Sequence, residues 1–405
     1  MSDFVIQPYF AGTGALGIPH ALSRSGWVGL FFLLLSAAMA QFTSCLLIRC
    51  LYHPSYSRLE SFSDIGYATF GRIGWSVSIG FSQVFLLSTS ILYVILAGDN
   101  LPVLLYSFTG AQIDRKVCIW ILAAAIGLPF VMVRNMRDVS FMSCFSSMAT
   151  FCLLLIVTVS STSDFKETVT HAHHDWAIPR NIPITFSTFT FSYCGNIIFP
   201  HLEASMREPN SWSKVMFVAT FVITLIYVIM GFFCYLVYGD AALVPIYKNL
   251  PTAAQNVAMI VVTIHVFLTV PMYLYVFTMS VESWIGLLPH DRQKAATACE
   301  SSSLLRYPTL IRTIVRIIEM VLCATVAVLV PYFGEFTNLI GTLTGELLTF
   351  VLPCMFWIKL SWHQGNHFER TACIFVMLIG IFCAIFGSID AVTAIVKTLE
   401  SHGAH

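Results

Sequence analysis

Long apolar stretches, separated by short polar ones, follow one another along almost the whole chain. Seven of them contain no Asp, Glu, Lys, Arg or His, for example Ser25–Ile48, Ile73–Gly98 and Val215–Gly239. A helix needs about 20 mostly apolar residues to cross the hydrocarbon core of a membrane. The pattern predicts an all-α, multi-pass membrane protein with eleven transmembrane helices, over residues 4–22, 26–50, 73–97, 116–133, 139–161, 182–206, 213–238, 251–287, 309–332, 335–358 and 370–396.

Two of these predicted spans are interrupted by residues that disfavour helix. Span one is interrupted within "FAGTGALGIPHALSRSGW" (Phe10–Trp27), where Gly12, Gly14, Gly17 and Pro19 follow closely on one another. Span six is interrupted at "FSYCGNIIFP" (Phe191–Pro200). Non-helical backbone at membrane depth is tolerated where it lines a cavity or is buried in protein. Small residues that let helices pack closely are the alternative explanation.

Each interrupted span opens a group of five spans, which predicts a repeat. Since five is odd, the second group must be inverted relative to the first, and such corresponding interruptions indicate a transporter binding site. We therefore expect one transporter domain over residues 1–405, with a first repeat over 1–161, a second over 182–358 and an additional helix over 370–396.

Composition and charge agree with a protein embedded in lipid. Hydrophobic residues make up 57% of the 405 residues and charged residues 10%, and the mean hydropathy is +0.79, so the lipid bilayer is the expected surroundings. The net charge is zero, and we expect no nucleic acid partner. Lys and Arg are more frequent in the loops on the side of the amino terminus, which predicts a cytosolic amino terminus and a carboxyl terminus on the opposite, luminal side.

The sequence offers little sign of metal, cofactor or enzyme chemistry. The twelve cysteines include no CxxC pair, so we expect neither a disulfide framework nor a zinc site. HExxH and GxSxG are absent, as are paired intramembrane aspartates, and we expect no enzyme and no cofactor. The loop segment "HAHHD" (His171–Asp175) could bind a metal or sense pH, but a solvated loop is the favoured interpretation.

Two stretches resemble a known family. "GALGIPHALSRSGWVGLFFLL" is similar to the first span of the amino acid/auxin permease family, and "FTFSYCGNIIFPHLEASMREP" is similar to its sixth span. The stretch "LIGTLTGELLTFVLPCMFWIKL" resembles the branch of vesicular inhibitory amino acid transporters and their vacuolar relatives. The resemblance implies a fold like that of the bacterial leucine transporter. It also implies secondary active transport of a small neutral amino acid, such as glycine or 4-aminobutyrate, coupled to protons.

The resemblance also implies a substrate site. It points to five residues of span one around the substrate carboxylate, and to four residues of span six on the other side: Gly12, Thr13, Gly14, Ala15 and Leu16, then Tyr193, Cys194, Gly195 and Asn196. Many sodium-coupled relatives have an asparagine where this chain has Pro8, which favours protons as the driving ion.

Titratable residues inside the predicted spans are the candidates for coupling or gating, because a charge there is expensive. Glu203 follows the span-six interruption and could carry the coupling proton or pair with an arginine as a gate. Glu346 could be a proton site or a satisfied structural carboxyl, and we expect it to matter less than Glu203. His265, with Thr269 one turn further on, could bind substrate or titrate, or simply hydrogen-bond a neighbouring helix. Tyr93 could close over the substrate, although packing is the commoner role of such an aromatic.

The sequence therefore predicts an alternating-access transporter in a synaptic or other cytoplasmic vesicle, or in a vacuolar or lysosomal membrane. In that mechanism the half-helices of spans one and six move relative to spans three, four, eight and nine. A vacuolar or plasma-membrane permease of broader specificity and an amino acid sensor without net transport are the alternatives.

Overall fold

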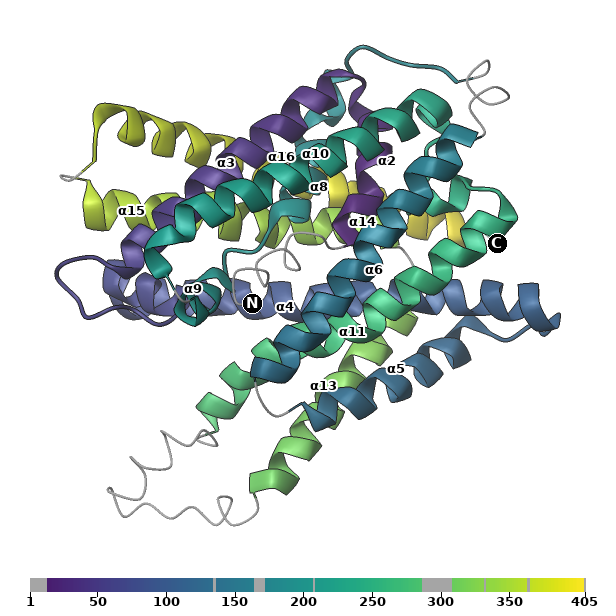
Figure 1. Ribbon diagram of the computed structural model, residues 1–405, viewed down its shortest axis with the longest axis horizontal. Helices are drawn as coiled ribbons and strands as arrows, with labels where there is room; N and C mark the ends of the chain where they lie inside the picture. Colours follow the sequence, from purple (N-terminus) through teal and green to yellow (C-terminus); the bar gives the residue numbers. More distant parts are fainter. Residues whose placement is uncertain are drawn as a thin grey trace. The chain divides into compact units, whose positions relative to one another are not determined.

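The computed structural model describes residues 13–133, 136–163, 172–206, 208–285, 308–330, 333–362 and 365–403, and the regular structure in these residues is helical, with no strand. Eight helical stretches in them are long and apolar enough to cross a membrane (Figure 1). They are Val28–Leu51 (α3), Phe62–Thr109 (α4), Arg115–Met132 (α5), Cys144–Thr162 within α6 (Met136–Ser163), Pro209–Ala241 around α10 (Trp212–Tyr238), Thr252–Trp284 (α11), Phe333–Ser361 and His367–Lys397 within α16 (His367–Gly403). An all-helical membrane fold is confirmed.

The other three predicted spans are either short or charged among the described residues. Span one continues from a 3₁₀ turn, Thr13–Gly17 (η1), into the short α2, Ile18–Ser25. Span six is divided into α8, Ile182–Tyr193, and α9, Phe199–Ser205. Span nine corresponds to α13, Pro308–Leu329, which contains Arg312, Arg316 and Glu319. The count of eleven spans and the boundaries of the two repeats stay predictions.

The chain divides into two compact units, which are described separately. The first comprises Met1–Phe85, Ser147–Val261 and Tyr332–His405, and the second comprises Leu86–Ser146 and Val262–Pro331. Helices α4, α6 and α11 contribute residues to both. Near its start α4 is kinked at Phe70 and Gly71, where Gly71 has a φ of 63°. A positive φ suits glycine, and the kink separates the first residues of α4 from the predicted span that begins at residue 73.

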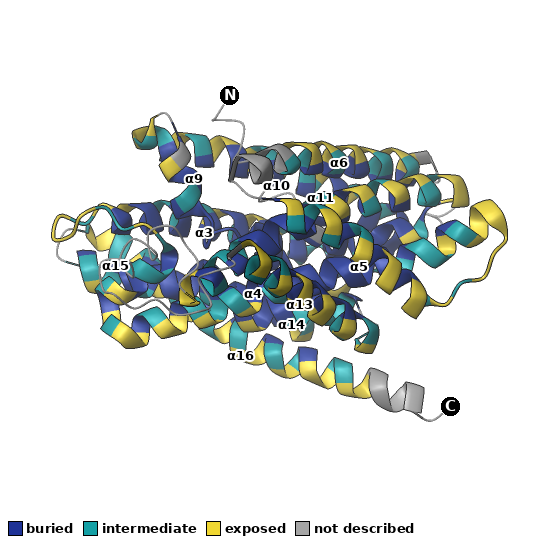
Figure 2. Ribbon diagram, turned by 90° about the horizontal axis from the view of Figure 1, so that it is seen from below, coloured by how far each residue is buried: buried dark blue, intermediate teal, exposed yellow. Residues whose placement is uncertain are grey.

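Helix α8 is the centre of the first unit. Every residue from Pro183 to Tyr193 is buried, and α8 packs against α2, α3 and α16. Helix α16 leaves one face exposed along its length (Figure 2). On its other face, two glycines allow α16 to pack closely against the core. A Cβ at Gly387 would lie 3.1 Å from the Ser187 Oγ, and a Cβ at Gly380 would lie 3.1 Å from the Phe350 Cβ. Small residues at a helix interface allow such close packing inside a membrane.

Helices α5 and α13 form an antiparallel pair in the second unit, and two arginines fix its ends. Arg316 of α13 is buried and donates to the carbonyl oxygens of Phe130 and Val133, at 3.0 and 2.5 Å. Arg115 of α5 donates to the carbonyl of Ala327 at 3.3 Å and pairs with Asp99 at 2.6 Å. A cation at the end of a helix satisfies carbonyls that have no partner within the helix.

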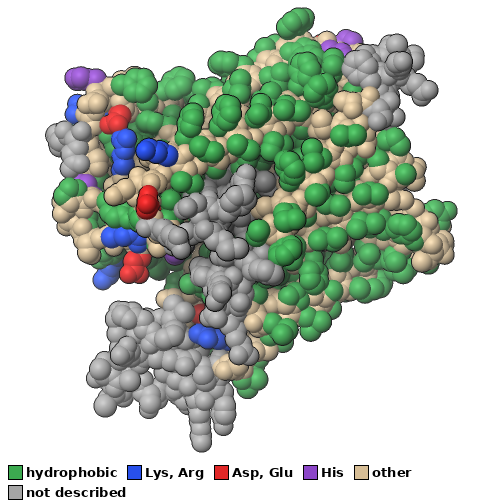
Figure 3. Space-filling model, viewed as in Figure 1, with side chains coloured by type: hydrophobic (Ala, Val, Ile, Leu, Met, Phe, Trp, Pro, Cys, Tyr) green, Lys and Arg blue, Asp and Glu red, His purple; other side chains and the backbone are tan. Residues whose placement is uncertain are grey.

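The outward-facing side chains suit a lipid environment. On the face shown in Figure 3, hydrophobic side chains cover most of the described surface, and charged ones gather near the ends of α3, α9 and α15 (Leu352–Ser361). Large apolar side chains such as Phe217 and Leu378 are about 60% exposed, at 61% and 59%. In water such a surface would be an aggregation hazard, whereas in a bilayer it meets acyl chains.

Candidate substrate, coupling and gating sites

The span-six interruption lies where the sequence predicts it. Helix α8 ends at Tyr193, Cys194 has extended backbone angles, and α9 begins at Phe199 with a proline in its first turn. The intervening residues are buried. Since α8 has no continuation over these residues, backbone groups at both ends of the break are without partners from a continuous helix.

The described part of span one packs directly against this break. Gly14, Ala15 and Leu16 of η1 are buried, and a Cβ at Gly14 would lie 2.9 Å from the Ser192 Oγ and 3.1 Å from its Cα. The structure thus places η1 against the last turn of α8, directly before the predicted span-six residues. Gly12 and Pro8 lie outside the described residues, and of Thr13 only the backbone is described.

Asn196 connects the break with span ten. Its Nδ2 donates to the carbonyl oxygens of Thr349 and Leu348, at 3.0 and 3.3 Å. In an α-helix the amide of residue 353 would donate to the carbonyl of Thr349, and in a π-helix to that of Leu348. Residue 353 is a proline, which has no N–H to donate. The Oδ1 of Asn196 is buried without a hydrogen-bond partner among the described residues.

Span ten is distorted at this point. Between α14 (Phe333–Ile340) and α15, two π-helical segments, Gly341–Gly345 (η8) and Leu347–Val351 (η9), flank Glu346. Short π segments are rare and occur often at functional sites. The distortion places a carboxyl group at the centre of an irregular helix that packs against α8 and α16.

Glu346 is fully buried, and neither of its carboxyl oxygens has a hydrogen-bond partner in the described structure. The hydroxyls of Thr190 and Ser187 on α8 lie close enough to interact with its carboxyl group. Both hydroxyls already donate to α8 carbonyls, of Phe186 and Pro183, at 3.0 Å each. Since a buried carboxylate without donors is costly, the site can hold a carboxyl group that exchanges a proton.

Glu203 has a different environment, because it is ion-paired. It lies on α9, is fully buried, and accepts hydrogen bonds from the Arg58 guanidinium and the Tyr52 hydroxyl. Arg58 also donates to the carbonyl of Pro200 at 3.1 Å. Partial burial of the phenol and the adjacent Glu203 carboxylate raise the pKa of Tyr52, so its hydroxyl remains a donor. This cluster ties the second half of span six to the segment after α3.

His265, Thr269 and Tyr93 form a cluster in the second unit. The His265 Nδ1 lies 2.8 Å from the hydroxyl of Ser146 on α6, which is also 2.5 Å from the Thr269 hydroxyl. The Tyr93 ring meets the His265 ring edge-on, with centroids 5.8 Å apart, and contacts the Tyr273 ring in the same way. His265 is therefore hydrogen-bonded to a neighbouring helix, which is one of the two roles expected from the sequence.

Four residues of these sites were not predicted from the sequence: Ser146, Arg58, Tyr52 and Pro353. Each lies far along the chain from the residue whose environment it shapes, so residue spacing alone does not indicate it. Pro353 carried a local signal, because a proline inside a predicted span frees carbonyls on the preceding turn. Tyr193, one of the predicted substrate-site residues, donates its hydroxyl to Thr224 on α10 at 3.0 Å, and its role at the substrate stays a prediction.

Comparison with known proteins identifies the family. The sequence profile of the transmembrane amino acid transporter proteins matches residues 2–393. The chain belongs to this family. Among curated relatives, the amino acid transporter AVT1J of Arabidopsis thaliana is 29% identical over 391 residues, covering 94% of this chain and 88% of the relative. The human vesicular inhibitory amino acid transporter is 26% identical over 410 residues, covering 96% and 75%.

Solved structures support the fold assignment of this family member. A Na⁺-coupled sialic acid symporter in a substrate-bound outward-open state has a TM-score of 0.55 at 14% identity, covering 96% of this chain and 89% of that one. The inward-facing structure of Mhp1 has a TM-score of 0.54 at 12% identity, covering 98% and 90%. These neighbours have the fold of the bacterial leucine transporter. The chain is a transporter of this fold and not an enzyme.

Proposed function

We propose that this family member is a secondary active transporter of a small neutral amino acid, working by alternating access. The observation that carries the proposal is the interruption between α8 and α9, against which η1 packs, with the unpaired Oδ1 of Asn196 at its centre. A zwitterion needs donors for its carboxylate and acceptors for its ammonium group. The first amides of a 3₁₀ turn have no partner within the turn and suit the carboxylate. The Asn196 Oδ1 and the carbonyls at the break suit the ammonium group.

The driving ion in this proposal is the proton, and Glu346 carries it. A fully buried carboxyl between two π segments is neutral when no cation or donor accompanies it, and it becomes charged when the site opens to water. The sequence ranked Glu203 above Glu346. The ion pair with Arg58 instead favours a gating role for Glu203, because opening that end of span six must separate the pair.

The membrane proposed for this activity is that of a vesicle or vacuole, where a proton gradient is available. The name of the human relative, a vesicular inhibitory amino acid transporter, supports this assignment, and glycine and 4-aminobutyrate are the first substrates to test. The amino terminus is proposed to face the cytosol, on the distribution of Lys and Arg.

Purified protein in proteoliposomes tests the proposal. Uptake of labelled glycine, 4-aminobutyrate and alanine is measured with a proton gradient, with a sodium gradient, and with neither. We expect accumulation with the proton gradient alone, unchanged when choline replaces sodium. Accumulation that requires sodium would contradict proton coupling, and binding of these amino acids without any flux would identify a sensor.

Exchange assays on two variants separate coupling from gating. Glu346→Gln should abolish accumulation driven by a proton gradient while preserving exchange of labelled for unlabelled substrate, because exchange needs no net proton movement. Glu203→Gln should alter both assays, since a weakened gate affects every passage. If Glu203→Gln loses proton-driven accumulation but keeps exchange, and Glu346→Gln does not, Glu203 and not Glu346 is the coupling residue.

A further inference from the structure

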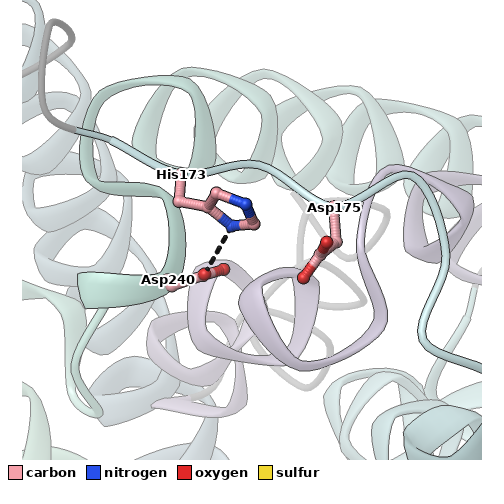
Figure 4. A group of neighbouring side chains, drawn as sticks. All are labelled: His173, Asp175 and Asp240. Carbon is pink, nitrogen blue, oxygen red and sulfur yellow. Dashed lines mark hydrogen bonds and ion pairs between the residues drawn. The ribbon is translucent and has the colours of Figure 1, made fainter.

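A cluster of metal-ligating side chains lies apart from the break. His173 and Asp175 belong to the segment between α6 and α8, and Asp240 belongs to the 3₁₀ turn Gly239–Ala241 (η5) that follows α10. The His173 Nδ1 is 2.9 Å from an Asp240 carboxylate oxygen, and one ligand atom from each residue lies within 4.8 Å of the other two. Figure 4 shows the three side chains on one side of the loop segment.

The backbone that carries these ligands is held in place on both sides. The carbonyls of Asp175 and Trp176 accept hydrogen bonds from the amides of Trp27 and Val28, at 3.1 and 3.0 Å. On the other side, the amide of Asp240 donates to the carbonyl of His173 at 3.2 Å. The segment is therefore fixed between the α2–α3 turn and the end of α10, which preorganises the ligands.

Two glycines make these close approaches possible. Gly26 and Gly239 have φ values of 77° and 50°. A Cβ at Gly26 would lie 2.6 Å from the Asp175 carbonyl oxygen, and one at Gly239 would lie 2.3 Å from that of His173. Neighbouring His174 turns the other way, with its ring 5.7 Å from Trp27 and 5.2 Å from Tyr235. His173 and Asp175 thus share the opposite side, where His173 is exposed and Asp175 is half-buried, as alternate residues of an extended segment do.

The charge of the cluster favours a cation. Among the described residues, neither Asp175 nor Asp240 forms an ion pair with a lysine or arginine, and the partner of Asp240 is His173. Two carboxylates beside one imidazole are a donor set that a divalent transition-metal ion neutralises. Imidazole nitrogen favours Zn²⁺ over Mg²⁺ or Ca²⁺, which prefer all-oxygen ligands.

We propose that His173, Asp175 and Asp240 form a binding site for a divalent transition-metal ion of the Zn²⁺ type, with water completing its coordination. Bond lengths of about 2.0–2.2 Å in a tetrahedral Zn²⁺ site place its ligand atoms roughly 3.3 Å apart. The spacings in the structure, from 2.9 Å to at most 4.8 Å, bracket that value. The bound ion bridges the segment before α8 to the end of α10.

Direct binding to the full-length chain tests this site independently of transport. Protein in nanodiscs is freed of metal with a chelator, and Zn²⁺ is titrated in competition with a fluorescent zinc indicator at pH 7.5. We expect one saturable Zn²⁺ per chain, weakened at least about tenfold by His173→Ala or Asp240→Asn, and less by Asp175→Asn. His367→Ala, an exposed histidine at the start of α16, is the matched control and should bind as the wild type does.

Thermal denaturation distinguishes a lost site from a damaged protein. The wild type should melt at a higher temperature with Zn²⁺ than without it, since a ligand that binds only the folded state stabilises it. His173→Ala should melt like the metal-free wild type and should not respond to Zn²⁺. Wild-type affinity in His173→Ala and Asp240→Asn, or the absence of stoichiometric binding to the wild type, would overturn the assignment.

Discussion

At the scale of single residues, buried polar groups define the proposed substrate, coupling and gating sites of this transporter. Asn196 donates two hydrogen bonds to span ten and keeps an unpaired oxygen at the break. Glu346 is buried with only the Thr190 and Ser187 hydroxyls of α8 near its carboxyl group among the described residues, whereas Glu203 is buried within an ion pair. Glu203 and Glu346 were identified from the sequence because titratable residues inside apolar spans are conspicuous, and Asn196 was identified through the resemblance to the sixth span of the family. The partners of Glu203 and Asn196 were not identified, because they lie far from these residues along the chain.

Gly14 should tolerate no side chain larger than hydrogen. An added Cβ would lie 2.9 Å from the Ser192 Oγ, so Gly14→Ala pushes η1 away from α8, and Gly14→Val pushes it further. We expect uptake by inserted protein to fall at least about tenfold for Gly14→Ala and to vanish for Gly14→Val. Gly80→Ala on α4 is the control, because no described atom lies within 4 Å of its added Cβ. Wild-type uptake by Gly14→Val would refute the substrate-site assignment.

The Arg58–Glu203 pair should show energetic coupling that a surface pair lacks. Arg58→Gln leaves a buried carboxylate without its cation, and adding Glu203→Gln removes that charge and should restore part of the lost stability. A double-mutant cycle on thermal stability should give a coupling energy of about 1–3 kcal/mol. The control cycle uses Arg49 and Glu369, whose side chains are 58% and 23% exposed, and should give about 1 kcal/mol or less. Equal coupling in both cycles would contradict a special role for the Glu203 pair.

At the scale of helices, the interruption of span six and the distortion of span ten belong together. Pro353 removes the amide that would bond the carbonyls of Thr349 or Leu348, and Asn196 supplies the donor instead. Asn196 of the interrupted span six thus provides the hydrogen bond that span ten lacks at Pro353.

Pro353→Ala should make Asn196 partly dispensable for stability. With Pro353 present, Asn196→Ala leaves two buried carbonyls without a donor, and we expect a loss of about 1–3 kcal/mol. In a Pro353→Ala background the restored amide can bond Thr349, so the same substitution should cost less than about 1 kcal/mol. Thermal melts of the single and double variants measure this. The control background is Pro129→Ala in α5, where the effect of Asn196→Ala should be unchanged.

Most helices were predictable from the sequence, and their irregularities were predictable only in part. Long uncharged stretches predicted α3, α5, α10 and α16 to within a few residues, except that α16 runs on to Gly403. Glycine and proline predicted the break after Tyr193. The π segments around Glu346 were not predicted, since a π-helix depends on packing against α8 and α16 more than on composition. The sequence raised His171–Asp175 as a possible metal-binding segment and favoured a solvated loop, because Asp240 approaches His173 and Asp175 only in the folded chain.

At the scale of the whole molecule, the number of spans fixes the sides on which the two termini lie. Eleven spans place them on opposite sides of the membrane, and any even number places them on the same side. This is tested with an epitope tag at each end of the full chain and a membrane-impermeant protease added to sealed vesicles. The protease should cleave one tag in right-side-out vesicles and the other tag in inverted vesicles. Cleavage of both tags together would contradict eleven spans.

Cys194 gives this transporter a built-in chemical reporter. The described cysteines form no disulfide, and Cys194 is buried directly at the break after α8, whereas Cys144 and Cys152 are exposed on the apolar helix α6. A hydrophilic maleimide reacts with a thiol only when water reaches it, so alkylation of Cys194 marks the moments when the break is open. Reagent added to one face of a sealed vesicle then reports which way the protein faces. Substrate that slows labelling from that face would reveal occupancy without any engineered probe.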